Sequence, residues 1–143
     1  MTVIAWDGKT LAADKRGTVA GMAYPVTKIY RARGHLVAFS GNAGHAAELL
    51  AWFELNGPHA AYPKRPEDED AAGMLVIDPK GRVLMYSPLS SLPVLIEAPF
   101  FARGAGRDYA MAAMHLGKSA REAVEIACVY DINCGNGVDV FTL

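Results

Sequence analysis

The sequence predicts an α+β fold in which two sheets pack face to face and one block of helices covers each sheet on its outer side. The predicted elements run in the order strands, helix, strands, two helices, strand, so the helices fall in two separate blocks. The strand segments are more continuously apolar than a half-exposed sheet needs, which is typical of strands buried on both faces. Two sheets covered outside by helices bury both faces of such strands.

Length and composition agree with one globular domain over residues 1–143. The chain is 52% apolar and 20% charged, a balance typical of a folded domain. The formal net charge of −1 gives no indication of a nucleic-acid or anionic-membrane partner. No stretch approaches the roughly 18 apolar residues of a membrane helix, and Asp7 interrupts any signal-peptide pattern. We therefore expect a cytoplasmic protein with reduced thiols at Cys128 and Cys134.

The front of the chain predicts two β-hairpins, because apolar segments flank short turns that contain glycine. Their strands are residues 2–6 with 10–14 and residues 27–32 with 35–40. Apolar residues at helical spacing follow over 42–57, and Gly57-Pro58 ends that helix. The proline-rich, acidic segment 57–71 then predicts a solvated surface loop.

The second half of the chain predicts further strands and then two helices. Strands at 74–78 and 82–87 flank a turn at 78–81, and short pieces broken by proline lie within 92–99 and 100–106. One helix covers about 106–116, and the next begins at Ser119, where Ser119 and Glu122 form a capping box. The last strand covers 138–143.

A candidate functional cluster follows from the first hairpin. A turn at residues 7–9 places Thr2 beside residues 13 and 14, and so brings Asp14 close to it. Lys28 is a charge within the next predicted strand. If that strand lies beside the hairpin, a hydroxyl, a carboxylate and an ammonium group converge at one end of a sheet. The alternative is ordinary, because charges at strand ends are mostly solvated and a lone lysine often marks an exposed face.

Several ordered motifs resemble the proteasome β-subunit and HslV-like family of N-terminal nucleophile hydrolases, including short bacterial proteasome homologues. The likeness covers nearly the whole chain. It rests on a Thr directly after Met1 and on the segments "LAADKR", "TKIY", "VAFSGNAGHAAELL", "GAGRDYAMAAM" and "SAREAVEIACVYDINCGNGVDVFTL". Each motif is weak alone, but the ordered set is fairly specific. The resemblance implies a single domain with a four-layer αββα sandwich, which agrees with the predicted element order.

The resemblance also implies a catalytic set of five residues. Thr2 matches the nucleophile, Asp14 the acid that holds the lysine, Lys28 that lysine, Gly41 the oxyanion-hole amide, and Asp131 the support of the terminal amine. A Thr hydroxyl needs a base, and the α-amine freed by removal of Met1, with a pKa of about 8, suits neutral pH better than lysine at about 10.4. No metal or other cofactor is needed.

Three departures from the family pattern bear on activity. Ala105 stands where the family often has a serine that helps the terminal amine. The segment 57–71 leaves no room for the family's second long helix of the first block, which its members use in ring contacts and ATPase docking. A retained Met1 would block the amine and leave the protein inert.

Three functions remain open at this point. The first is a threonine peptidase that acts on peptides or unfolded proteins inside a homo-oligomer, with an ATPase unfoldase as a partner that the sequence does not support. The others are a non-catalytic proteasome-like subunit and a small-molecule amidase. Small residues in the two late helices predict close helix contacts between copies: Ala110, Ala112, Ala113, Ala120 and Ala123. The histidines show no metal spacing, and we expect packing or surface roles for them.

Overall fold

The computed structural model describes residues 2–55, 61–68 and 70–143. The chain divides into two compact units, one made of the residues up to Ile29 together with Ala98–Leu143 and the other of Tyr30–Glu97. The expectation of one domain over 1–143 stays a prediction.

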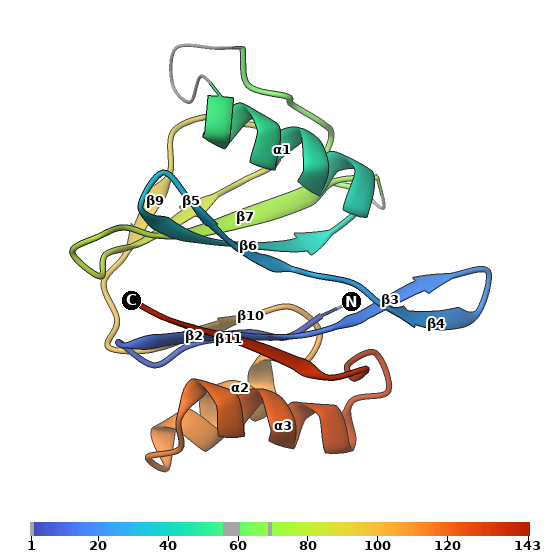
Figure 1. The fold of residues 1–143 in the computed structure, drawn as a ribbon, viewed down its shortest axis with the longest axis vertical. Helices are drawn as coiled ribbons and strands as arrows, with labels where there is room; N and C mark the ends of the chain where they lie inside the picture. Colours follow the sequence, from blue (N-terminus) through green and yellow to red (C-terminus); the bar gives the residue numbers. More distant parts are fainter. Residues whose placement is uncertain (1, 56–60, 69) are drawn as a thin grey trace. The chain divides into compact units, whose positions relative to one another are not determined.

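The first unit is a four-stranded sheet covered by two helices (Figure 1). Its strand order is β10-β1-β2-β11, and all neighbours are antiparallel. The helices pack against each other and against the central strands. The elements are β1 (Ile4–Trp6), β2 (Thr10–Asp14), β3 (Arg16–Val19), β4 (Met22–Pro25), β10 (Phe101–Arg103), α2 (Arg107–His115), α3 (Ala120–Tyr130) and β11 (Val138–Thr142).

Small side chains bring the two helices close to this sheet. Ala110, Ala120 and Ala123 are completely buried and Ala113 nearly so, and they join Val3 in one apolar cluster. These alanines therefore pack inside their own unit, and the expectation that they mediate contacts between copies is wrong for them. An alanine on this face allows the helix backbone to approach the strands closely, which a larger residue would prevent.

Helix α3 begins as the sequence predicts. The Ser119 hydroxyl oxygen accepts the Glu122 N–H at 3.2 Å, and the Glu122 carboxylate accepts the Ser119 N–H at 2.9 Å. A third acceptor comes from the first hairpin, where Asp7 Oδ2 accepts the Ala120 N–H at 2.8 Å. The hairpin turn and the helix start are thus tied by one carboxylate.

The register of the first hairpin differs from the expected one. Thr2 was expected beside Ala13 and Asp14, but the ladder pairs Ile4 with Ala13. The Asp14 N–H instead donates to the Val3 carbonyl oxygen at 3.2 Å. Thr2 therefore lies just before the strand pairing and reaches Asp14 through its side chain.

The turn itself explains this shift. Asp7 N–H donates to the Thr10 carbonyl at 3.2 Å, so Asp7 pairs with Thr10 and the turn holds only Gly8 and Lys9, one residue fewer than the expected turn at 7–9. Asp7 Oδ1 also accepts the N–H groups of Lys9 and Thr10, at 3.0 and 2.8 Å. An aspartate that bonds to the backbone two and three residues ahead stabilises such a turn.

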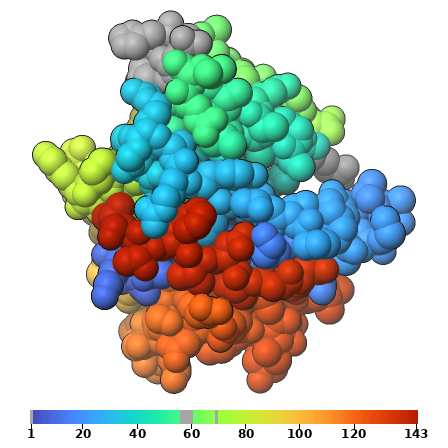
Figure 2. All heavy atoms as spheres, in the orientation of Figure 1, coloured from blue at the N-terminus to red at the C-terminus, as the bar shows by residue number. Residues whose placement is uncertain are grey.

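A hairpin that the sequence reading missed, β3–β4, follows β2. Ala20 and Gly21 form its two-residue turn with φ values of 47° and 79°, as a type I′ turn requires. Val19 and Met22 at its tip are 54% and 63% exposed. Figure 2 shows this hairpin, coloured blue, projecting from the rest of its unit.

The second unit is a five-stranded sheet in the order β5-β6-β7-β8-β9 with one helix packed on it (Figure 1). Leu49, Trp52 and Phe53 form the buried side of the helix and pack with Phe39 and Met74 of the sheet. In segment 57–71 the described residues form no helix, and 57–60 and 69 lie outside the described residues. The elements are β5 (Ile29–Ala32), β6 (His35–Gly41), α1 (Ala43–Leu55), β7 (Ala72–Ile77), β8 (Val83–Tyr86) and β9 (Val94–Ile96).

Candidate active site

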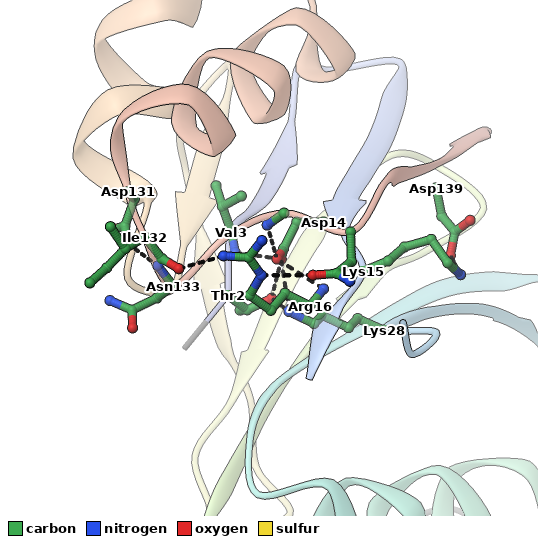
Figure 3. Close-up of polar contacts among 12 residues, drawn as sticks. Thr2, Val3, Asp14, Lys15, Arg16, Lys28, Asp131, Ile132, Asn133 and Asp139 are labelled. Atoms are coloured by element: carbon green, nitrogen blue, oxygen red, sulfur yellow. Dashed lines mark hydrogen bonds and ion pairs between the residues drawn. The ribbon is translucent and has the colours of Figure 1, made fainter. Parts of the chain in front are cut away.

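Three polar side chains meet inside the first unit. The Thr2 hydroxyl donates to Asp14 Oδ1 at 2.7 Å, and Lys28 Nζ donates both to Thr2 Oγ1 at 2.5 Å and to Asp14 Oδ1 at 2.8 Å. Figure 3 shows these side chains pointing toward one another. Thr2 is 1%, Asp14 0% and Lys28 8% exposed. The structure thus brings together the hydroxyl, carboxylate and ammonium groups. Lys28 does so from just before β5 (Ile29–Ala32), and the expectation that its strand pairs beside the first hairpin is wrong, because β5 belongs to the other sheet.

Asp14 is the centre of this cluster. Asp14 is the last residue of the buried strand β2, and both of its carboxylate oxygens accept hydrogen bonds. The donors are the Thr2 hydroxyl, Val3 N–H (3.0 Å) and Lys28 Nζ on Oδ1, and Arg16 N–H (3.2 Å) and Gly135 N–H (3.0 Å) on Oδ2. A buried carboxylate needs such compensation, because an unpaired charge in the interior is very costly.

The ammonium group of Lys28 has a perturbed acidity. Burial lowers the pKa of Lys28 below its ordinary value, while the hydrogen bond to Asp14 and the charge of that carboxylate oppose the shift. A cation that lies against Thr2 Oγ1 stabilises any negative charge that develops on that oxygen. The arrangement therefore favours deprotonation of the hydroxyl.

The main chain of Thr2 is held by the turn at residues 104–106. The Gly106 N–H donates to the Thr2 carbonyl oxygen at 3.1 Å. Gly104 has a φ of +98°, and a Cβ at this position would meet the Thr2 carbonyl oxygen and lie 2.7 Å from Thr2 Cγ2. Ala105 stands between these two glycines, so its side chain brings no hydroxyl group to the turn that contacts Thr2.

Arg16 is a residue of this site that the sequence analysis did not select. Its Nε donates to Asn136 Oδ1 at 2.7 Å and its Nη1 to the Ile132 carbonyl at 2.6 Å (Figure 3). Arg16 thus fixes the loop whose Gly135 N–H donates to Asp14. The available signal was the charged run "DKR" at the end of an apolar strand.

Asp131 lies in the same loop, directly after α3. Its Oδ1 accepts the Asn133 N–H at 2.8 Å, and its carbonyl oxygen accepts the Cys134 N–H at 3.1 Å. These bonds shape the turn that leads to Gly135. The expected support of a terminal amine by Asp131 stays a prediction, and Met1 lies outside the described residues.

Gly41 belongs to the second unit, where it is the last residue of β6. Its φ is +101°, and a Cβ there would meet the Ala71 carbonyl oxygen and lie 2.9 Å from Ala72 Cα. The position thus requires glycine for two independent reasons, backbone conformation and space. Its expected role as an oxyanion-hole donor stays a prediction.

The two cysteines lie in or against the apolar cluster of the first unit. Burial, with a smaller contribution from the Asp14 charge, raises the pKa of Cys134 to about 12 and that of Cys128 to about 11. Cys134 is part of the apolar cluster beneath α2 and α3. Within the described residues, no group of three or more His, Cys, Asp or Glu residues forms a metal site, and no helix is long and apolar enough to cross a membrane.

Comparison with known proteins adds a fold-level likeness over the whole chain. No family model and no curated protein matches the sequence. Among solved structures, BPH from Thiobacillus denitrificans in complex with epoxomicin is similar at 22% identity and a TM-score of 0.75, covering 100% of this chain and 98% of that chain. BPH without that compound gives 21% identity and a TM-score of 0.74, with 99% and 96% coverage.

Eukaryotic HslV from Trypanosoma brucei is also similar, at 18% identity and a TM-score of 0.68, covering 99% of this chain and 98% of that chain. The chain has a proteasome- and HslV-like fold. The likeness confirms the predicted α+β fold class of the proteasome-subunit-like hydrolases.

Proposed function

We propose that the protein is a threonine-type N-terminal nucleophile hydrolase that cleaves peptide bonds once Met1 has been removed. The observation that carries the proposal is the buried hydrogen-bonded triangle of Thr2, Asp14 and Lys28. The hydroxyl group of an ordinary surface threonine is hydrated and does not contact a buried ion pair, whereas the Thr2 hydroxyl contacts both members of one. Here the ion pair is kept inside the protein despite its desolvation cost, which is typical of functional sites.

The first chemical step is attack by Thr2 Oγ1 on the carbonyl carbon of the scissile bond. Removal of Met1 frees an amine on the same Cα, roughly 3 Å from Oγ1 by covalent geometry, and this amine takes the hydroxyl proton. The Lys28 ammonium stabilises the developing alkoxide, and Asp14 holds Lys28 in place. The new C–O bond gives a tetrahedral oxyanion, for which the resemblance assigns the Gly41 amide as donor.

Collapse of this intermediate breaks the C–N bond, and the protonated α-amine returns its proton to the leaving amine. The resulting ester on Thr2 is then attacked by water, which loses a proton to the same α-amine. The carboxylic acid product leaves, and the Thr2 hydroxyl is restored. Every proton is thus carried by groups of the substrate, water and Thr2 itself.

The substrate class in this proposal is an extended peptide or an unfolded protein chain. A peptidase of this kind has to be shielded from folded proteins, and a closed homo-oligomer is the simplest shield for a single chain. We therefore include homo-oligomerisation in the proposal. An ATPase unfoldase is left out, because the helix that the family uses for docking has no counterpart in the described part of segment 57–71.

Intact-mass measurement combined with an active-site probe tests the proposal. The purified protein is expected to have lost Met1, to hydrolyse peptide substrates and to gain the mass of one epoxomicin molecule, the compound held by the similar BPH structure. Thr2→Ala is expected to abolish both hydrolysis and adduct, and Thr2→Ser to retain both. Turnover in Thr2→Ala at the wild-type rate would disprove the nucleophile assignment.

The same measurements separate the two alternatives. Retained Met1 with neither hydrolysis nor adduct would favour a non-catalytic proteasome-like subunit. Loss of Met1 with hydrolysis of small acyl amides but not of peptides would favour an amidase with the same nucleophile. A panel of both substrate types at equal concentration therefore decides the class of reaction.

A further inference from the structure

His45 is a fully buried side chain of the second unit, and both of its ring nitrogens are engaged. The Ala72 N–H donates to Nδ1 at 2.8 Å, and Nε2 lies 2.5 Å from the Pro63 carbonyl oxygen. Because a backbone N–H donates to Nδ1, that nitrogen carries the lone pair and the ring proton is on Nε2. The imidazole thus links two segments: its Nδ1 accepts a hydrogen bond from Ala72 of β7, and its Nε2–H donates one to Pro63 in the preceding loop.

The residue that His45 Nδ1 contacts, Ala72, lies directly beside Gly41. Ala72 is the ladder partner of Gly41. The Ala71 carbonyl oxygen accepts the Asn42 N–H at 2.9 Å, and Asn42 Oδ1 in turn accepts the His45 N–H at 2.9 Å. One histidine therefore contacts the chain on both sides of the point where β6 passes into α1.

Gly41 has no freedom to adapt to movement of these neighbours. Gly41 has a φ of +101°, and backbone atoms of Ala71 and Ala72 occupy the space where a Cβ would lie. A shift of this pair would turn the Gly41 peptide group with it. The Ala72 N–H, which is buried, would also be left without an acceptor if the imidazole were removed, and an unpaired buried donor is destabilising.

We propose that His45 is a positioning residue for the Gly41 amide, acting through Ala72 and not by contact with substrate. The inference rests on the proposed function, in which this amide stabilises the oxyanion. A displacement of about 1 Å in a catalytic group can cost about a hundredfold in rate. The nitrogen that matters is Nδ1, because it alone bonds to the ladder partner of Gly41.

Two near-isosteric variants separate the two ring nitrogens. In His45→Asn the amide oxygen stands where Nδ1 stands and keeps an acceptor for the Ala72 N–H. In His45→Gln the amide nitrogen stands near the place of Nε2 and keeps the donor to Pro63 but loses that acceptor. His45→Leu removes both, and His115→Asn, at an exposed position of α2, is the matched control.

The first readout is the separation of kcat from KM on the Met1-processed full-length protein. We expect kcat of His45→Asn within about threefold of wild type and kcat of His45→Gln at least about tenfold lower, with KM unchanged in both. Melting temperatures are measured alongside. Equal kcat in the Asn and Gln variants, or a kcat that follows the melting temperature alone, would overturn the inference and leave His45 as a packing residue.

The second readout does not need activity. In the Thr2→Ala protein, the amide signal of Gly41 in a ¹H–¹⁵N spectrum is expected to move in His45→Gln and His45→Leu and to stay near its place in His45→Asn. An unmoved signal in the Gln variant overturns the positioning role. If the wild type shows no Thr2-dependent hydrolysis, the proposed function fails, and this signal alone decides the role of His45.

Discussion

Gly104 and Thr2 are in direct backbone contact. A Cβ on Gly104 would lie 2.7 Å from Thr2 Cγ2 and would meet the Thr2 carbonyl oxygen, so the turn at residues 104–106 leaves no room for any side chain there. Because backbone atoms are among those met, rotation of a side chain cannot relieve the overlap. The position of the proposed nucleophile is thus set in part by a turn that is distant from it in sequence.

Gly104→Ala is therefore expected to displace Thr2 and to lower kcat at least about tenfold. Gly117→Ala is the matched control, since Gly117 has a similar φ of +89° but nothing within 4 Å of an added Cβ. Both variants bear the strain of a left-handed alanine, about 1–2 kcal/mol. Enzyme assays and thermal melting of both decide the matter, and equal activity in the two variants would contradict the prediction.

The Lys28–Asp14 ion pair gives a second prediction. Lys28→Ala leaves a buried carboxylate without its cation, so we expect a loss of about 3–5 kcal/mol in the free energy of unfolding and of at least about tenfold in turnover. Lys28→Arg is not expected to restore activity, because a planar guanidinium does not fit a site built for a compact ammonium group.

The control for this prediction is Lys15, which forms a partly exposed ion pair with Asp139 at 2.8 Å. Lys15→Ala is expected to change the free energy of unfolding by less than about 1 kcal/mol and to leave turnover unchanged. Urea unfolding and peptide hydrolysis are measured on each variant. A fully active Lys28→Ala protein would remove Lys28 from the mechanism.

Asp7 gives a prediction for stability alone. Its carboxylate accepts hydrogen bonds from two N–H groups of its own turn and from the Ala120 N–H of α3. Asp7→Ala therefore removes the side-chain acceptor of both the turn and the start of the helix. We expect a loss of about 1–3 kcal/mol in the free energy of unfolding, measured in urea. Asp108→Ala, which changes an exposed acid in the first turn of α2, is expected to cost less than about 0.5 kcal/mol.

The local pattern of the sequence was sufficient to predict most of the elements and the proximity of Thr2 to Asp14. Apolar periodicity and the Ser119 capping box are short-range signals, and the structure confirms the helix that they mark. The register of the first hairpin was wrong because the Asp7 side chain stabilises a shorter turn of Gly8 and Lys9, which strand periodicity does not report. The β3–β4 hairpin was missed because its strands are largely exposed and lack an apolar run.

The surroundings of the cluster could not be predicted in the same way. The donors to Asp14 Oδ2 include the Gly135 N–H, which is distant in sequence and is held by Arg16. Residue spacing does not indicate that Gly104 contacts Thr2, although the resemblance placed the turn at residues 104–106 near the terminal amine, and no motif indicates that His45 bridges to Ala72. Such contacts depend on tertiary packing, and residue spacing gives no information about them.

The cysteine thiols give a prediction that depends on pH. Because the pKa of Cys134 is raised to about 12 and that of Cys128 to about 11, both thiols stay protonated near pH 8, and we expect iodoacetamide to label the native protein at least about a hundredfold more slowly than the unfolded chain. The folded state holds these protons more tightly than the unfolded state. The protonated thiols therefore make their full contribution to the free energy of unfolding below about pH 9, and this contribution is lost as the pH rises toward about 12. Rapid labelling of native Cys134 would contradict the burial that causes the shift.

The last prediction is self-association. The alanines of α2 and α3 are mostly used inside their own unit, so a contact between copies has to use other residues of these helices. Tyr109 and Tyr130 stack on each other with ring centroids 5.8 Å apart and are 44% and 67% exposed, and Val129 beside them is 73% exposed. Exposed apolar and aromatic side chains on neighbouring helices are typical of interfaces between subunits.

We expect light scattering at micromolar concentration to give a mass of several chains and Tyr130→Glu to lower that mass, since a carboxylate in an apolar contact is costly to desolvate. Glu125→Gln, at an exposed position of α3 where the carboxylate forms an ion pair with Arg121, is the control and is expected to leave the mass unchanged. A monomer in the wild type would remove the shielded compartment from the proposal. The small-molecule amidase or the non-catalytic subunit would then be the better account of the same fold.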